Sequence, residues 1–570
     1  MLEKYIQAAR REKKADLVLK NADYLDVFTG EIRHGDIAVA GEKIVGVGEY
    51  EGEKEIDCTG LTVLPGYIDG HVHIESSQLS PEEFASLIVP RGTVTIIADP
   101  HEITNVCGMA GCEYIAKASE NVPLEVKLQL PSCVPATPFE TSGAVLNGKD
   151  TEDNIVQPYI FGLGEFMNYV GVTNCDPDVI RKLEAAHSNG RIIDGHAPAV
   201  YGYELNAYLC GGISTDHECV TREEVEEKIS KGMYVHIRHG SSTHNLVNAR
   251  YMTAANMRRF LLCTDDRHAA DLKSKGHLDD ALRRLVADGI NPVWAVTAAT
   301  LNAAECYGLK YRGGIAPFWL ADLVVVDNMK DFNAQYVLKG GRLVAEGGKP
   351  LFDTSKRYLP DNVLNTVHLK EMKPEDFVIT LTGTKAKAMT ILPGGVVTGC
   401  EIVDVESRGG DTVVKGTDLL KLIVVERHHM TGNIGKGLFK GYGFHGGALG
   451  ITIAHDSHNV ILMGDDNESL AKAANTLREI GGGMVIVDSD TGEVHSLTLD
   501  IGGLMSSRDA ESLQQDSRDL IERAYAKGVK REYEAFMSLA FLSLAVIPKL
   551  KLLDTGLFDV EKFGFTDINA

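Results

Sequence analysis

The chain has 570 residues, of which 44% are hydrophobic, so it can bury a large core and is too long for one ordinary domain. Its formal net charge of −23 and its pI near 5.3 argue against a nucleic-acid or anionic-membrane partner, because binding to phosphates requires a basic face. The ten cysteines are scattered and contain no C-x-x-C pair. This usage is typical of free thiols in a reducing compartment, and we expect a cytoplasmic location.

Neither the N-terminus nor the longest apolar stretch predicts export or membrane insertion. Residues 1–14 predict a polar amphipathic helix, without the apolar run of a signal peptide. Residues 535–547 form the longest apolar stretch, but it is shorter than the roughly 18 residues of a membrane span and ends at Pro548. We expect a buried helix there.

Short alternating segments predict a small β-sandwich built from two distant parts of the chain. They lie at 15–19, 28–31, 35–39, 43–47, 321–327 and 336–344. Both parts open with Ala-Asp-Leu-Val and have hairpin spacing, so we expect them to pair in one sheet. The predicted composite domain comprises residues 1–64 and 311–358, with a long insertion between them.

Within the insertion, apolar runs recur about every 20 to 35 residues, which is the spacing of βα units. The candidate strands are 67–73, 94–98, 126–130, 160–163, 191–194, 212–215, 234–237 and 260–263. Eight such strands predict an α/β fold, a (β/α)8 barrel over residues 65–310. Residues 359–570 predict a C-terminal α+β domain, with strands at 419–425, 450–454, 460–462, 484–487 and 495–499 and a helix at 468–480.

Residues able to bind metal follow the predicted barrel strands. His71 and His73 are separated by one residue, so on a strand both imidazoles share a face and can reach one divalent ion. A single polar residue after a strand is more often an ordinary loop residue. The occurrence of such residues at the ends of several strands of one barrel favours a functional site. The four imidazoles and two carboxylates of the set suffice for two metals if one carboxylate bridges: His71, His73, His196, His217, Glu165 and Asp265. Asp265 would then accept a proton from the activated water.

These motifs resemble a known enzyme family. Pro-Gly-Tyr-Ile-Asp-Gly-His-Val-His at 65–73, single histidines after the fifth and sixth strands and Thr-Asp after the eighth resemble the amidohydrolase superfamily. Within this superfamily, the chain resembles the adenine deaminases. The resemblance lies in the long C-terminal domain and in the motifs at 71–77, 99–102, 164–168, 214–218 and 263–268. The resemblance covers nearly the whole chain.

The resemblance implies hydrolytic deamination of adenine to hypoxanthine and ammonia by a metal-bridged hydroxide, in purine salvage. Its cofactors would be two divalent ions, manganese first and iron or zinc as alternatives. Its partners would be adenine, water and further copies of the chain, in a dimer or larger homo-oligomer. By the same resemblance, His71, His73, Glu165 and Asp265 would hold one metal. Glu165, as the bridging ligand, would hold the other metal together with His196 and His217, and Asp266 would bind the purine N7.

The sequence leaves several candidates for the acid that protonates the purine ring. Many related deaminases carry a glutamate just after the fifth-strand histidine, but alanine and proline follow His196 here. Position leaves Glu102, Glu75 and Glu218 as candidates, and we favour Glu102 because it stands at a strand end, although a helix cap is an equal alternative. His239 is expected to bind substrate, or else to make a supporting hydrogen bond.

The C-terminal domain has its own histidines: His428, His429, His445, His455 and His458. An accessory metal site, a lid over the barrel, an interface and a solvated turn are all compatible with this pattern. The enzymatic rivals act on a cyclic amide or on another 6-substituted purine. Cyclic-amide enzymes of the superfamily usually bridge their metals with a lysine, which is absent at position 165. A non-catalytic scaffold would typically have lost metal ligands.

Overall fold

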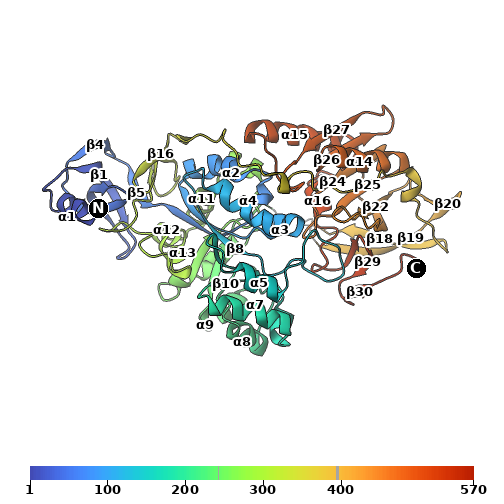
Figure 1. The fold of residues 1–570 in the computed structure, drawn as a ribbon, viewed down its shortest axis with the longest axis horizontal. Helices are drawn as coiled ribbons and strands as arrows, with labels where there is room; N and C mark the ends of the chain where they lie inside the picture. The colour runs from blue at the N-terminus through green and yellow to red at the C-terminus, as the bar shows by residue number, and fades with distance from the viewer. Residues whose placement is uncertain (242, 393–396) are drawn as a thin grey trace.

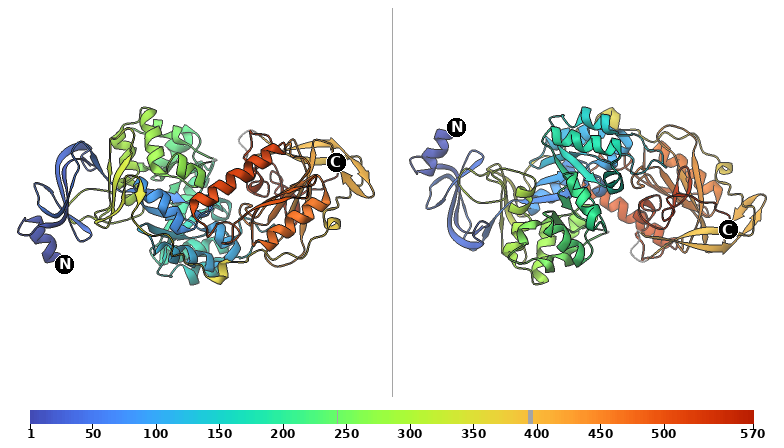
Figure 2. Two further views of the ribbon diagram at one scale, coloured as in Figure 1. Left: turned by 90° about the horizontal axis from the view of Figure 1, so that it is seen from above. Right: turned by 90° about the horizontal axis from the view of Figure 1, so that it is seen from below.

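The computed structural model describes residues 1–241, 243–392 and 397–570. Three parts follow one another along the long axis in Figure 1. A β-sheet near the N-terminus lies at one end, the parallel strands with their helices lie in the middle, and the C-terminal strands lie at the other end. Figure 2 shows the same order from above and below.

The terminal sheet joins the two distant parts of the chain. Its nine strands are β1 (Ala15–Asp26), β2 (Glu31–Ala40), β3 (Lys43–Gly48), β4 (Gly52–Asp57), β5 (Thr62–Pro65), β14 (Leu323–Val326), β15 (Ala334–Lys339), β16 (Arg342–Glu346) and β17 (Lys349–Pro350). The expected pairing is confirmed, since β5 and β14 are antiparallel neighbours with Leu323 opposite Pro65. In β1, Leu17 and Leu19 join one apolar cluster, and Val18 joins another that includes α1 (Leu2–Ala9), as period-2 alternation requires.

The expected strand at 28–31 is wrong. Residues 28–30 form most of the turn between β1 and β2, and Glu31 already begins β2. In this turn the Asp26 carboxylate accepts hydrogen bonds from the backbone amides of Phe28 and Thr29. Gly30 has φ +77°, a backbone conformation that favours glycine.

The middle part has eight parallel strands, which confirms the predicted (β/α)8 barrel. They are β6 (Tyr67–Val72), β7 (Thr93–Ala98), β8 (Glu125–Leu130), β9 (Ile160–Phe166), β10 (Ile192–Gly195), β11 (Thr215–Asp216), β12 (Tyr234–Arg238) and β13 (Phe260–Cys263). Strands β6 to β10 and β11 to β13 form two ladders, which a parallel bridge between Val72 and Asp265 joins. The sixth strand begins later than expected at 212–215, because Gly212, with φ +82°, still belongs to the turn after the preceding helix.

Helices cover this barrel. They are α2 (Pro81–Ile88), α3 (His101–Cys107), α4 (Met109–Ser119), α5 (Gly148–Asn154), α6 (Tyr169–Thr173), α7 (Pro177–Ser188), α8 (Gly202–Cys210), α9 (Arg222–Ser230), α10 (Ala269–Ser274), α11 (Leu278–Ala287), α12 (Pro292–Ala298) and α13 (Leu301–Cys306). Local signals fix several starts. At α9, for example, Thr221 and Glu224 form a reciprocal capping box. Of these helices, α3 begins directly after β7 and lies toward the C-terminal part in Figure 1.

The C-terminal part contains an eight-stranded sheet. In chain order its strands are β18 (Lys385–Ile391), β19 (Thr398–Asp404), β22 (Leu419–Val425), β23 (Ile434–Lys440), β24 (Gly447–Ile451), β25 (Val460–Gly464), β26 (Gly483–Asp488) and β27 (Val494–Thr498). Helices α14 (Asn467–Glu479) and α15 (Ala510–Ala526) pack against its strands. The predicted helix at 468–480 is confirmed within one residue.

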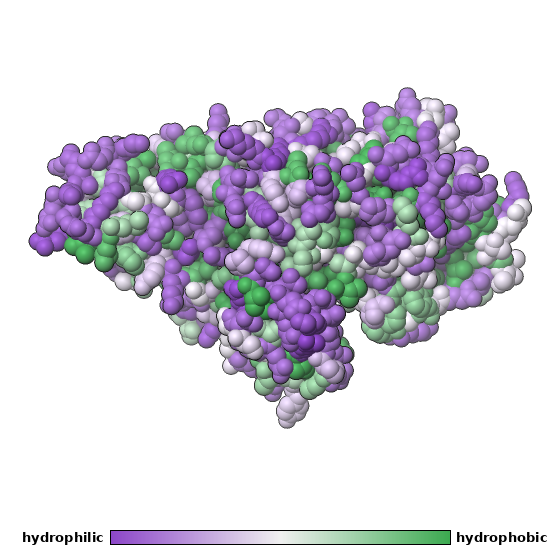
Figure 3. Space-filling model, viewed as in Figure 1, coloured by the Kyte–Doolittle hydropathy of each residue, from purple (hydrophilic) through white to green (hydrophobic). Residues whose placement is uncertain are grey.

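The expected buried helix at 535–547 is wrong in its conformation. Only α16 (Met537–Ala540) is helical; the following residues are turns, and Leu542 accepts a hydrogen bond from the Leu552 amide. Most of the run is buried, as expected, but Val546 is 48% exposed. Within the described residues no helix is both long and apolar enough to span a membrane. Hydrophilic residues cover most of the face in Figure 3, with apolar ones in small groups.

Candidate metal centre

The carboxyl ends of the barrel strands bring six side chains into one cluster. The members are His71 in β6 and His73 after it, Glu165 in β9, His196 after β10, His217 after β11 and Asp265 after β13. Five of them are almost completely buried, and His196 is partly exposed. Barrel closure explains this meeting, because parallel strands place their carboxyl ends on one face. The sequence-predicted set is thus assembled in space.

One group of potential ligands contains two imidazoles and a carboxylate. His71 Nε2 and His73 Nε2 lie 3.2 Å apart, and Asp265 Oδ1 lies 3.0 Å from His73 Nε2 and 3.8 Å from His71 Nε2. Asp265 has φ +56°, and its amide donates to the His71 carbonyl at 2.9 Å, so the backbone turns sharply at this residue.

A second group lies on the other side of the Glu165 carboxylate. His196 Nδ1 lies 2.8 Å from Glu165 Oε2, and His217 Nε2 lies 3.3 Å from the same oxygen. The two ring nitrogens are 3.3 Å apart.

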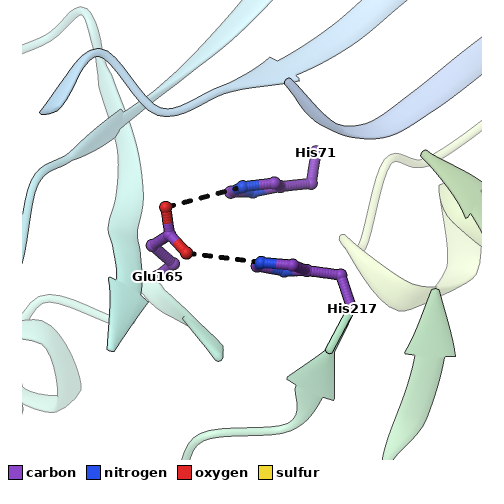
Figure 4. Close-up of side chains that lie close together, drawn as sticks. All are labelled: His71, Glu165 and His217. Atoms are coloured by element: carbon purple, nitrogen blue, oxygen red, sulfur yellow. Dashed lines mark ion pairs between the residues drawn. The ribbon is translucent and has the colours of Figure 1, made fainter. Parts of the chain in front are cut away.

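Glu165 connects the groups through its two oxygens. Oε1 lies 3.8 Å from His71 Nε2 and 3.4 Å from His73 Nε2, whereas Oε2 faces the second group. Figure 4 shows His71 and His217 beside this carboxylate, each facing one oxygen; their rings stack at 4.3 Å. One oxygen per group is the arrangement of a bridging carboxylate.

The donor set fits divalent metal ions. In each group two imidazole nitrogens face each other, at 3.2 Å in the first and 3.3 Å in the second. A cation between two such nitrogens would bind both of their lone pairs. The His73 ring is oriented because its Nδ1 lies 2.8 Å from the Asp99 carbonyl, which leaves Nε2 as the free ligand nitrogen. His71 Nδ1 similarly lies 3.4 Å from Asp194.

Electrostatics keep both carboxylates negative. Burial alone would raise the pKa of Glu165, but hydrogen bonds from four histidines, His101 first, lower it well below its usual range. Burial also opposes ionisation of Asp265, whereas the Arg238 charge and the His73 hydrogen bond lower its pKa well below the usual range. In turn, these carboxylates help raise the pKa of His73 against the effect of burial.

Two neighbours of the cluster were missed from the sequence. His101 Nδ1 lies 3.3 Å from Glu165 Oε1, and the Arg238 guanidinium pairs with both Asp265 and Glu218. Strand alternation could have found Arg238, because it shares the inward face of β12 with His236.

The same alternation explains why His239 is not brought together with the cluster. His239 Nε2 lies 2.7 Å from the Asp280 carboxylate, and its carbonyl accepts a hydrogen bond from Arg267. Its side chain does not line the cavity next to the six residues. The expected direct contact with a ligand is therefore absent from this conformation, and the alternative supporting hydrogen bond describes the geometry.

A cavity of about 430 Å³ adjoins the cluster and lies between the barrel and the C-terminal part. This volume is in the range of small-molecule sites, about 300 to 1,000 Å³. Asp266 lines it, and its carboxylate accepts a hydrogen bond from the Ser76 hydroxyl. The C-terminal part supplies one wall of this cavity: His455, Asp456, Phe541, Leu544, Val546, Ile547 and Pro548. A lid over the barrel was one of the alternatives for His455 in the sequence, whereas the apolar residues of this wall were not expected there. A second cavity, of about 440 Å³, also borders Phe541 but contains none of the six clustered residues.

The three carboxylates considered as acids lie in different surroundings. Glu102 lines the cavity, but His455 and His458 contact its two oxygens. Glu218 also lines the cavity, and both of its oxygens face Arg238. Glu75 lies outside this cavity, and its carboxylate accepts a hydrogen bond from the Ile103 amide at 3.2 Å.

Comparisons with known proteins agree with this architecture. The amidohydrolase family model matches residues 62–344, and that of the adenine deaminase C-terminal domain matches residues 395–564. Adenine deaminase from Clostridium acetobutylicum is 43% identical over 99% of each chain, and adenine deaminase 2 from Desulfotalea psychrophila is 43% identical over 100% of this chain and 99% of its own. The barrel and its clustered ligands thus define a metal-dependent hydrolase of the amidohydrolase class. The chain belongs to the adenine deaminase family.

Proposed function

We propose that the protein catalyses the hydrolytic deamination of adenine to hypoxanthine and ammonia, and so acts in purine salvage. The proposal rests on the position of Glu165, whose two oxygens each face one group of imidazoles. The chain that holds this arrangement is 43% identical to an adenine deaminase over 99% of its length.

The proposed cofactors are two divalent ions, manganese first, with iron or zinc as alternatives. His71, His73, Glu165 and Asp265 would hold one ion, and Glu165, His196 and His217 the other. Such ions, when bound, lower the pKa of a water molecule so that hydroxide is available at neutral pH.

The chain's own residues would move protons and orient the ring. Asp265 accepts a proton from water and passes it to the amino group, which leaves as ammonia. A C–O bond forms at C6, the C6–N bond breaks, and a ring nitrogen gains a proton. Asp266 holds the purine through N7, and the Ser76 hydroxyl fixes its carboxylate. Glu102 takes part in protonating the ring through its hydrogen bond with His455.

We also propose the division into a composite β-domain (1–64 and 311–358), a barrel (65–310) and a C-terminal domain (359–570). The barrel strands all fall within 65–310, in support of this division. A homo-oligomer, a dimer or larger, remains the proposed assembly. A cytoplasmic location is supported by the free state of all ten cysteines.

Metal analysis combined with an adenine assay tests the proposal. Protein from manganese-supplemented cells is analysed for metal content, and the same sample is assayed for adenine loss by absorbance. Two metals per chain with turnover are expected. Two metals without turnover would overturn adenine as the substrate and favour a cyclic amide or another purine, and neither metal nor turnover would favour a scaffold.

A further inference from the structure

A hydrogen-bonded cluster joins the barrel to the C-terminal part beside the cavity. Glu102, at the start of α3, directs one carboxylate oxygen to His455 Nδ1 at 2.6 Å and the other to His458 Nε2. Both histidines belong to the loop between β24 and β25, more than 350 positions away. All three side chains are buried, with at most 8% exposure.

Backbone contacts fix the proton positions in this cluster. The Ala454 amide donates a hydrogen bond to His458 Nδ1 at 3.1 Å. His458 Nδ1 is therefore an acceptor, and the ring proton lies on Nε2, where it is donated to Glu102. A metal ion on Nε2 would require the proton at Nδ1, directly opposite the Ala454 N–H. The position of the ring proton on Nε2 thus favours a hydrogen bond from His458 to Glu102 over an accessory metal site.

Glu102 and His455 both line the cavity, but the two Glu102 oxygens face His455 and His458, so His455 is the member that keeps a polar atom for a ligand. Its Nδ1 faces Glu102, its ring stacks on Phe541 at 4.8 Å, and the residue lines the cavity. Its amide donates to the Ala540 carbonyl at 3.0 Å, so the apolar run holds its backbone. Since Nδ1 is occupied, Nε2 is the ring nitrogen available to a molecule in the cavity.

The other candidate donors are engaged. Glu218 forms a forked pair with Arg238 that occupies both of its oxygens, and Glu75 does not line the cavity. His101 has a carboxylate near each ring nitrogen: Nδ1 lies 3.3 Å from Glu165, and Nε2 lies 3.5 Å from Glu102.

We propose that His455 is the catalytic residue that donates a proton from Nε2 to the purine ring nitrogen N1, and that Glu102 and His458 are its positioning residues. This assignment rests on the proposed deamination. The N1–H bond forms and the His455 Nε2–H bond breaks as the oxygen of water bonds to C6. One water proton then reaches the leaving nitrogen through Asp265, and the other restores His455, so that ammonia and neutral hypoxanthine are released. Sequence analysis favoured Glu102 for the same step; here it acts through His455.

Charges around His455 support a donor role. Burial lowers the pKa of His455, but Glu102 from α3, Asp266 after β13 and Asp456 in the same loop raise it to about 9. His458 also faces Glu102 but is kept neutral, because burial lowers its pKa to about 4. Below pH 9 the His455 ring therefore carries a proton on both nitrogens.

His455→Gln and His455→Ala, prepared with the metal loading used for the wild type, test the assignment. We expect kcat to fall by about 10² to 10⁴ fold, with two metals retained, and exogenous imidazole to restore part of the activity of His455→Ala. The matched control is His445→Ala, at an exposed histidine of the same domain, which should keep wild-type kcat.

Glu102→Gln supplies a second test that a merely structural role would not reproduce. Because the donor must be protonated, wild-type kcat is expected to decline above about pH 9. Loss of the Glu102 charge should move that decline to lower pH. If wild-type protein turns over adenine but His455→Gln retains its kcat, or if Glu102→Gln leaves the pH profile in place, the assignment to His455 is overturned. Absence of wild-type turnover would instead overturn the proposed function. Circular dichroism distinguishes either result from misfolding.

Discussion

The barrel end and the C-terminal wall contribute to the same cavity in different ways. The barrel supplies the candidate ligands from its strand ends, where they are separated by one residue or by one to three βα units. The C-terminal part supplies an apolar run and a short histidine loop, neither of which is next to a barrel strand. The comparison teaches that a repetitive architecture makes ligand positions periodic, whereas a wall supplied by another domain follows no period.

Removing a ligand from the barrel end is expected to have the largest effect. Glu165→Gln loses the negative charge that faces both imidazole groups, and Asp265→Asn loses the proposed proton acceptor. Each should lower kcat/KM by about 10³ fold or more, with an intact fold by circular dichroism. Glu223→Gln, at an exposed position in α9, is the control. An active Asp265→Asn enzyme would contradict the proposed mechanism.

Truncating the C-terminal wall should have an intermediate effect. Phe541→Ala removes an aromatic face from the cavity and from the His455 ring. We expect KM for adenine to rise about tenfold and the free energy of unfolding to fall by roughly 1 to 2 kcal/mol. Steady-state kinetics and denaturant unfolding measure both. Tyr203→Ala, at a side chain that is 91% exposed, should change neither value. Unchanged KM in Phe541→Ala would remove the C-terminal wall from the binding site.

Substitution of His239 is expected to have the smallest catalytic effect, in contrast to substitution of Asp266, which lines the cavity. His239→Gln keeps a donor toward Asp280 and lies outside the cavity, so KM should stay within about twofold while unfolding is favoured by roughly 1 to 3 kcal/mol. Asp266 lines the cavity, so Asp266→Asn should raise KM for adenine about tenfold. A large KM change in His239→Gln with none in Asp266→Asn would reverse the two assignments.

Prediction from the sequence succeeded where local spacing carries tertiary information. His71 and His73 share a strand face, and the other four candidate ligands lie at the ends of β9, β10, β11 and β13, so their convergence follows from the barrel alone. The same rule, applied more strictly to β12, would have selected Arg238 over His239. Prediction failed at 535–547, where apolar composition indicates burial but does not distinguish a helix from buried turns.

The sequence by itself determined the parallel barrel, its insertion in the terminal sheet and the six candidate ligands at the strand ends, because strand period and βα spacing are local features of the chain. Only the tertiary structure decided which groups surround the ligand. It brought Glu102 into contact with His455 and His458 and placed Phe541 beside the cavity. Such contacts depend on how the barrel and the C-terminal part pack, and that packing is set by many weak apolar contacts distributed along the chain.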